Sequence, residues 1–136
     1  MAKPAGSKKI LVVDDEDSVR LFLQDFLFDR DFNAIAAATG EEALEKVAKE
    51  KPDIVLLDIT MPGMSGLECL ERIKAKFPKT VVIMMSAQIE VSLISRAKEL
   101  GAFDYITKPF SLEDLESELV GLIKQSGSAG SGGKPS

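Results

Sequence analysis

Five polar side chains stand where apolar stretches of this sequence end: Asp14, Asp15, Asp58, Ser86 and Lys108. Short apolar runs bounded by turn residues are typical of strands buried on both faces of a parallel sheet. Strand ends of one polarity share one edge of such a sheet, so we expect the five groups to converge. Asp58 taken alone is equally well explained as the first residue of a solvated turn. The convergence is what indicates function.

Carboxylates that lie close together require a compensating cation, because like charges disfavour each other's ionisation. Mg²⁺ prefers oxygen ligands, retains several waters and often bridges carboxylates to a phosphoryl group. Lys108 would add a positive charge and Ser86 a hydroxyl donor, which suits in-line phosphoryl transfer. Aspartate is also a known covalent phosphoryl acceptor. The pattern therefore predicts a magnesium-dependent phosphoryl site.

The elements that must position these groups alternate along the chain between strand-like and helical patterns. Strands are predicted over 8–13, 32–38, 54–58, 81–85 and 103–107, and helices over 18–28, 40–51, 66–77, 90–100 and from 112 onward. This alternation is typical of a doubly wound α/β domain with a parallel sheet. Periodicity does not reveal the order of the strands.

Helix starts are marked by hydroxyl residues. Thr39 with Glu42, and Ser65 with Glu68, have the spacing of capping boxes, and Ser111 is the predicted cap of the last helix. The apolar stripe expected on that helix is Leu112, Leu115, Leu119 and Leu122.

Composition sets limits on function. A chain of 136 residues fits one domain, and its net charge of -5 argues against nucleic-acid binding through that domain. Without histidine, zinc sites of the usual kind and Ser-His or Cys-His catalysis are excluded. The single cysteine, Cys69, is predicted to be a buried packing residue rather than a nucleophile. No apolar run is long enough for a membrane span, so a cytoplasmic protein is expected.

The two ends differ in composition from the centre. Residues 1–7 are predicted to be a flexible leader, 8–125 the folded domain, and 126–136 a flexible tail or linker rich in Gly and Ser.

Four motifs in this order resemble the signature of the bacterial two-component response-regulator receiver domain. They are Asp14-Asp15, the stretch from Asp58 to Gly66, Ser86-Ala87, and the stretch from Tyr105 to Phe110. The resemblance runs from about Lys8 to Lys124. It implies a flavodoxin-like fold of five parallel strands in the order 2-1-3-4-5 with five helices.

The same resemblance implies a role for each site residue. Asp58 would be the phosphoacceptor and Lys108 would pair with the phosphoryl group. Asp15 and Asp58 would bind Mg²⁺ directly, with Asp14 acting through a water and Thr60 through its backbone carbonyl.

Ser86 and Tyr105 would be the switch residues, and the Lys108-Pro109 bond resembles the family's cis peptide. Phosphorylation by a histidine kinase would change the surface of the fourth helix, fifth strand and fifth helix, which would control a downstream protein target or output domain. The domain would promote its own phosphorylation and dephosphorylation rather than act as an enzyme on other substrates. Some of Val91, Leu93 and Ile94 would face a partner.

Three other readings compete with this one. A haloacid-dehalogenase phosphatase needs a second acid two residues after the first, where this chain has Thr60. A Rossmann domain needs a glycine-rich turn after the first strand, which is missing here. The third is a receiver-like module that is never phosphorylated, which the acids, Ser86 and Lys108 argue against.

The last helix carries four acids and no arginine, unlike the receivers that dimerise through basic residues in this helix. A monomer or weak dimer is therefore expected. The four acids are Glu113, Asp114, Glu116 and Glu118.

Overall fold

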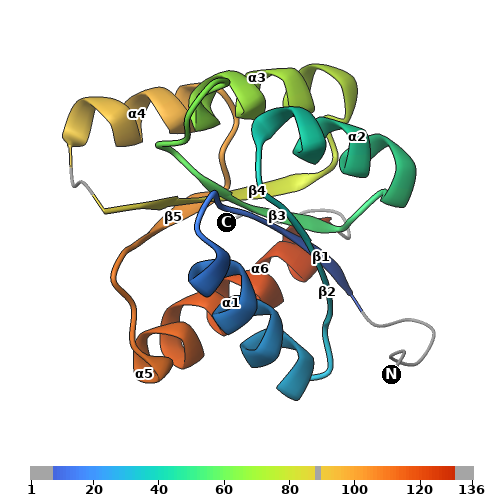
Figure 1. Ribbon diagram of the computed structural model, residues 1–136, viewed down its shortest axis with the longest axis vertical. Helices are drawn as coiled ribbons and strands as arrows, with labels where there is room; N and C mark the ends of the chain where they lie inside the picture. Colours follow the sequence, from blue (N-terminus) through green and yellow to red (C-terminus); the bar gives the residue numbers. More distant parts are fainter. Residues whose placement is uncertain (1–7, 88–89, 131–136) are drawn as a thin grey trace.

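The computed structural model describes residues 8–87 and 90–130, which form a five-stranded parallel sheet with helices on both faces (Figure 1). The strand order is β2-β1-β3-β4-β5, as the resemblance implies. In chain order the elements are β1 (Lys9–Val13), α1 (Asp17–Asp29), β2 (Asn33–Ala37), α2 (Gly40–Glu50), β3 (Ile54–Asp58), α3 (Gly66–Lys76), β4 (Val81–Ser86), α4 (Val91–Glu99), β5 (Asp104–Thr107), α5 (Leu112–Asp114), the π-helical turn η1 (Leu115–Leu119) and α6 (Val120–Gly130).

Two separate cores form because successive side chains of a strand point to opposite faces of the sheet. On β3, Val55 and Leu57 pack with α2, α3 and α4, whereas Ile54 and Leu56 pack with α1 and the C-terminal helix. Figure 1 shows these two helix layers on opposite sides of the sheet. Every residue of β3 is buried, which explains why its sequence is an uninterrupted apolar run that ends in Asp58.

The C-terminal helix differs from its prediction. It consists of the short α5, the wider turn η1 and then α6. Leu115, Leu119 and Ile123 are buried, four residues apart, whereas Leu112 is 57% exposed and Leu122 is only partly buried. Leu122 still packs against the core on this face of the sheet. The predicted stripe is therefore wrong only at Leu112, and it missed Ile123.

Helix α6 also continues to Gly130, five residues into the stretch for which the sequence predicts a tail. Extending an existing helix adds one hydrogen bond for each residue fixed, so a helix can enter such a stretch more easily than it can start there. Residues 1–7, predicted as a leader, and 131–136 lie outside the described residues. Among the described residues, no helix is long and apolar enough to cross a membrane.

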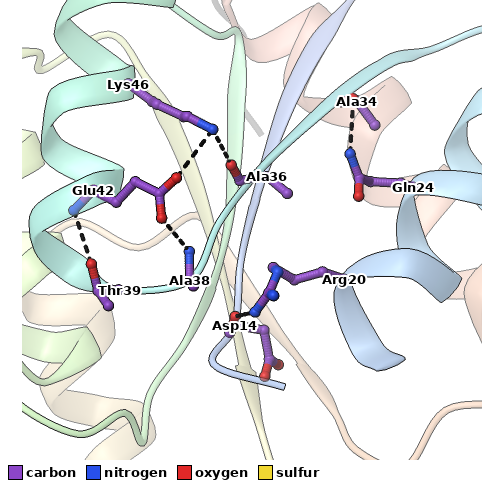
Figure 2. Close-up of polar contacts among 9 residues, drawn as sticks. All are labelled: Asp14, Arg20, Gln24, Ala34, Ala36, Ala38, Thr39, Glu42 and Lys46. Carbon is purple, nitrogen blue, oxygen red and sulfur yellow. Dashed lines mark hydrogen bonds and ion pairs between the residues drawn. The ribbon is translucent and has the colours of Figure 1, made fainter. Parts of the chain in front are cut away.

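Of the predicted caps, only the one at Ser111 forms a full capping box, in which the side chains of Ser111 and Asp114 each accept the other residue's backbone N–H. Thr39 accepts from the N–H of Glu42, but the Glu42 carboxylate accepts from Ala38, one residue before the expected donor (Figure 2). The prediction of a reciprocal box at Thr39 was wrong in this detail.

At the second predicted box, Ser65 accepts a hydrogen bond from the N–H of Glu68. The Glu68 carboxylate instead pairs with Arg72, one helical turn further along α3. The reciprocal half of this box was therefore also predicted wrongly, because an ion pair at i,i+4 competes for the same carboxylate.

The edge strand β2 is tied to both helix layers by side chains that donate to its carbonyls. Gln24 of α1 donates to Ala34, and Lys46 of α2 donates to Ala36 (Figure 2). Unpaired carbonyls at a sheet edge invite pairing with another strand, so these contacts protect the edge.

Gly66 lets the first turn of α3 approach the end of β3. A Cβ at this position would lie 2.1 Å from the carbonyl oxygen of Asp58 and 2.7 Å from the Cα of Ile59. The Gly66 N–H donates to the carbonyl of Ile59 at 2.9 Å. This glycine therefore sets how closely the helix sits against the residue that ends β3.

We predict that Gly66→Ala lowers the free energy of unfolding by about 1–3 kcal/mol, because the new methyl group overlaps backbone that cannot move away cheaply. The measurement is chemical denaturation followed by circular dichroism. Gly121→Ala is the matched control, since a Cβ there meets nothing within 4 Å and alanine favours a helix. Equal stability of the two variants would contradict the close packing at Gly66.

Candidate functional site

The carboxyl edge of the sheet brings three aspartates together. Asp14 follows β1 directly, Asp15 comes next, and Asp58 is the last residue of β3, the neighbour of β1. One carboxylate oxygen from each lies within 4.8 Å of the others. Parallel pairing of β1 with β3 is what places these groups side by side.

Two of these carboxylates are withdrawn from solvent. Asp14 is fully buried and Asp58 is 4% exposed, whereas Asp15 is exposed. Each buried side chain is held by the N–H two residues further on: Glu16 donates to Asp14 at 3.0 Å, and Thr60 donates to Asp58 at 3.3 Å. Such local bonds fix the rotamer of an aspartate at the end of a strand.

Lys108 supplies the positive charge of the cluster. Its Nζ lies 2.8 Å from Oδ2 of Asp14 and 3.3 Å from Oδ2 of Asp58. The first of these contacts is an ion pair by distance, although Oδ2 of Asp14 receives no hydrogen bond of regular geometry. One ammonium group thus faces two buried carboxylates.

The neighbouring strand ends fix the base of Lys108. Ser86 is the last residue of β4, is 3% exposed and is paired in register with Thr107. The backbone N–H of Lys108 donates to the carbonyl of Ser86 at 2.8 Å. The Lys108-Pro109 peptide bond is cis, as the resemblance implies. Ser86 therefore lies between the strand that ends in Asp58 and the strand that Lys108 follows.

The electrostatics of the cluster favour addition of a cation. Burial raises the pKa of Asp58, and the Asp14 carboxylate raises it further, while Lys108 and the Thr60 N–H oppose this. Burial alone would lower the pKa of Lys108, but its close contacts with the Asp14 and Asp58 carboxylates raise it overall. Lys108 therefore stays charged, and one cation faces more than one anion.

The donor set fits a hard dication such as Mg²⁺. Three carboxylates of different strand ends offer oxygens within one coordination sphere, and Mg²⁺ favours oxygen ligands. The buried Oδ2 of Asp14 lies 2.8 Å from the Lys108 ammonium but accepts no hydrogen bond of regular geometry.

A cavity of about 270 Å³ opens beside the cluster. Its lining includes Asp15, Asp58, Thr60 and Lys108. A second, largely apolar cavity of about 440 Å³ adjoins it and is lined by residues of α1 and of the segment after β5, including the stacked rings of Phe22 and Phe110. Asp58 therefore lines a cavity at the carboxyl edge of the sheet.

Comparison with known proteins identifies the family. A family model described as the response regulator receiver domain matches residues 10–120. The chain belongs to this family. It is 40% identical over 109 residues to sporulation initiation phosphotransferase F of Bacillus subtilis, a match that covers 80% of this chain and 88% of the relative. A CheY-like receiver domain from Methanospirillum hungatei has the same fold, with a TM-score of 0.84 and 28% identity over 90% of this chain and 98% of the other.

Receiver domains also occur within longer proteins. The chain is 38% identical over 120 residues to the alkaline phosphatase synthesis transcriptional regulatory protein PhoP of Bacillus subtilis, a match that covers 88% of this chain but only 50% of PhoP. The receiver family thus includes relatives of about this length and relatives of twice the length.

The predicted switch residue Tyr105 lies away from the carboxylates. It is half-buried on β5 and packs into the core on the α4 side, together with Leu93. Ala97 is the one fully buried residue of α4, and Val91 is 76% exposed. Helix α4 is therefore packed against the rest of the domain by few buried side chains.

One supporting residue was not predicted from the sequence. The guanidinium of Arg20 donates to the carbonyl of Asp14 at 2.7 Å (Figure 2) and also pairs with Asp17. The spacing of Asp17 and Arg20 on one helix face could have indicated the ion pair, but not the contact with β1. Arg20 therefore fixes the backbone that carries the buried carboxylate.

Cys69 is buried on α3, as predicted, and burial raises the pKa of its thiol to about 12. A thiol that stays protonated is a poor nucleophile. The residue serves packing in this receiver domain.

We predict that Asp58→Asn raises the melting temperature at pH 7 in the presence of EDTA. The raised pKa means that the folded protein holds this proton more tightly than the unfolded chain, so ionised Asp58 destabilises the fold. The gain should vanish as the pH falls below 3.8, the ordinary value for this group, because both states are then protonated. Calorimetry at several pH values measures it.

Asp25→Asn is the matched control, since Asp25 is an exposed carboxylate on α1. It should leave the melting temperature nearly unchanged across the same pH range. A lower melting temperature for Asp58→Asn at pH 7 would show that Lys108 outweighs the cost of burial.

Proposed function

We propose that this receiver domain accepts a phosphoryl group on Asp58 from the phosphohistidine of a histidine kinase and passes the signal to a protein target or output domain. The observation that carries the proposal is the position of Lys108, whose partly buried ammonium group lies between Asp14 and Asp58 beside a cavity. This arrangement offers a nucleophilic oxygen, a fixed cation and room for a phosphoryl group.

In the proposed step, an oxygen of the Asp58 carboxylate bonds to phosphorus while the bond from phosphorus to the imidazole nitrogen breaks. The electron pair of that bond stays on the imidazole, which becomes neutral as it leaves. Lys108 lies 3.3 Å from Asp58, so its ammonium group can stabilise the charge on the transferred oxygens. Positioning and charge stabilisation are the main requirements of phosphoryl transfer.

For the cofactor, we assign Mg²⁺ to Asp15, Asp58 and the backbone carbonyl of Thr60, with Asp14 acting through a water. When bound, the ion would neutralise part of the carboxylate charge and accept a phosphoryl oxygen. The Thr60 N–H already donates to Asp58 at 3.3 Å, which holds the next peptide beside the cluster. Asp15 is the exposed acid, so its carboxylate could exchange a water for the metal ion without any rearrangement of buried groups.

The proposed partners are a histidine kinase and a downstream protein or output domain, with no nucleic acid bound through this domain. A cytoplasmic location and a monomer or weak dimer remain predictions from the sequence. The acids of the last helix argue for such an assembly because Glu113, Asp114, Glu116 and Glu118 are all exposed.

We further propose that Ser86 and Tyr105 relay the phosphorylated state to α4. Ser86 lies at the end of β4 next to both Asp58 and Lys108 in the strand order, so its hydroxyl can donate to a phosphoryl oxygen. Tyr105 and Leu93 of α4 both pack against the same core cluster. Because few side chains of α4 are buried, this helix could take different positions in the unphosphorylated and phosphorylated states.

We predict that incubation with Mg²⁺ and acetyl phosphate adds one phosphoryl group to the native protein. The bond from phosphorus to the acetate oxygen breaks, and acetate leaves. Intact-mass measurement should show the addition in the native protein and in Asp25→Asn, but not in Asp58→Asn or without Mg²⁺. Lys108→Ala should slow the reaction by roughly 100-fold, the usual cost of losing a charge-stabilising donor.

Asp15→Asn adds a separate arm to this experiment. It should remain folded while losing both Mg²⁺ affinity and phosphorylation, because it removes a direct ligand. An unchanged Mg²⁺ titration in Asp15→Asn would contradict the assigned ligand set. A native protein that stays inert to every donor would favour a receiver-like module that is never phosphorylated.

For the relay, we predict that beryllofluoride, a phosphoryl mimic, shifts amide NMR signals at Ser86, Tyr105 and along α4 in the native chain. Ser86→Ala should keep the shifts around Asp58 but reduce those of α4 at least about threefold, since the hydroxyl no longer draws the strand end toward the mimic. Shifts confined to the neighbourhood of Asp58 in the native chain would contradict the relay.

A further inference from the structure

The loop between β3 and α3 rests on the first turn of α2. Gly40 is the first residue of α2 and is buried. A Cβ on Gly40 would lie 3.0 Å from both Cβ and Sδ of Met64 and 3.2 Å from its Cγ. These distances are tighter than ordinary van der Waals contact, so the side chain of Met64 fills the space that the glycine leaves.

The surface under Met64 is held rigidly. Thr39 caps α2, and Glu42 reaches back to the N–H of Ala38 while pairing with Lys46 (Figure 2). The carbonyl of Gly40 also accepts a contact at 3.8 Å from the thiol of Cys69 on α3. The start of α2 is therefore fixed both to the end of β2 and to the helix that follows the loop.

Met64 anchors the second half of the loop, after its turn, to the core. Ile59 and Met61 are buried before the turn at Pro62 and Gly63, and both turn residues are exposed. Met64 is the first side chain after that turn to pack back against the core. Without it, the chain from the turn to the cap of α3 would have no apolar anchor among the described residues.

The loop carries a group of the site. Thr60 lies within it, and the N–H of Thr60 donates to Oδ1 of Asp58 at 3.3 Å. Gly66 fixes one end of the loop against the backbone of Asp58 and Ile59. A shift at Met64 would therefore be passed to the Thr60 peptide through a short segment that is held at both ends.

We propose that Met64, seated on Gly40, is a positioning residue that sets the place of the Thr60 peptide relative to Asp58, and with it the strength of Mg²⁺ binding. This proposal rests on the proposed function for its effect on phosphorylation, but not for its effect on the loop. Met64 touches no reacting group, so its influence would act through Thr60.

The experiment compares Gly40→Ala, Met64→Ala and the double variant with the native protein. It measures Mg²⁺ affinity from the amide shifts of Asp58 and Thr60, the rate of phosphorylation by acetyl phosphate, and the melting temperature. Gly40→Ala should reduce both affinity and rate by about three- to tenfold, because even small misplacements of positioned groups are costly. Gly121→Ala, whose Cβ meets nothing within 4 Å, should change neither.

The double variant separates positioning from general damage. Added to Met64→Ala, Gly40→Ala should change affinity and rate by a clearly smaller factor than it does in the native chain. The Sδ and Cγ atoms that the new methyl would meet are gone, and only the Cβ at 3.0 Å remains. Such non-additivity is expected of residues in contact. A Gly40→Ala protein that melts earlier but binds Mg²⁺ and reacts like the native one would overturn the proposal, as would additive effects in the double variant.

The readouts also separate this proposal from the proposed function. If the native protein binds Mg²⁺ but is never phosphorylated, the Mg²⁺ affinities of the variants still decide. If it binds neither, the metal-free amide signals of residues 59–65 decide: shifts in Gly40→Ala support the contact, and unchanged signals overturn it. If Gly40→Ala does not fold, Met64→Ala alone must lower affinity at least about threefold, or the proposal fails.

Discussion

The structure depends on a charge imbalance at the carboxyl edge of its sheet. Asp14 and Asp58 are buried, and Lys108 alone among the described residues pairs with both. Removing carboxylates from water is costly unless they are paired or bind a cation. This cost appears at Asp58, where burial raises the pKa of the carboxyl group. A bound cation is what this arrangement of charges favours.

The fold meets that requirement with contacts that are mostly made by backbone. Parallel pairing aligns the ends of β1, β3 and β4, and the N–H groups of Glu16 and Thr60 hold the two buried carboxylates. Gly66 brings α3 against the end of β3, and Gly40 leaves space for Met64. The two glycines lie on different helices, yet both define where the same loop can lie. Close packing at two glycines thus limits where the loop next to the charged cluster can lie.

Much of this could be predicted from the sequence because the signals are local. The apolar run before Asp58 indicated a buried strand that ends at a carboxylate, and Ser111 indicated a helix start. The strand order came only from the resemblance, since periodicity says nothing about which strands are neighbours. The π turn within the last helix, the exposure of Leu112 and the contact of Met64 with Gly40 depend on tertiary packing. A pattern within one segment does not contain that information.

The central claim is that the phosphoryl group is carried by Asp58 and by no other group of the cluster. Sodium borohydride tests this directly, because it reduces an acyl phosphate to an alcohol with release of phosphate, which converts a phosphorylated aspartate into homoserine. After reaction with acetyl phosphate and Mg²⁺, peptide sequencing by mass spectrometry should find homoserine at position 58, with Asp14 and Asp15 unchanged. Homoserine at position 14 or 15, or a phosphate on Ser86 that survives borohydride, would contradict the account.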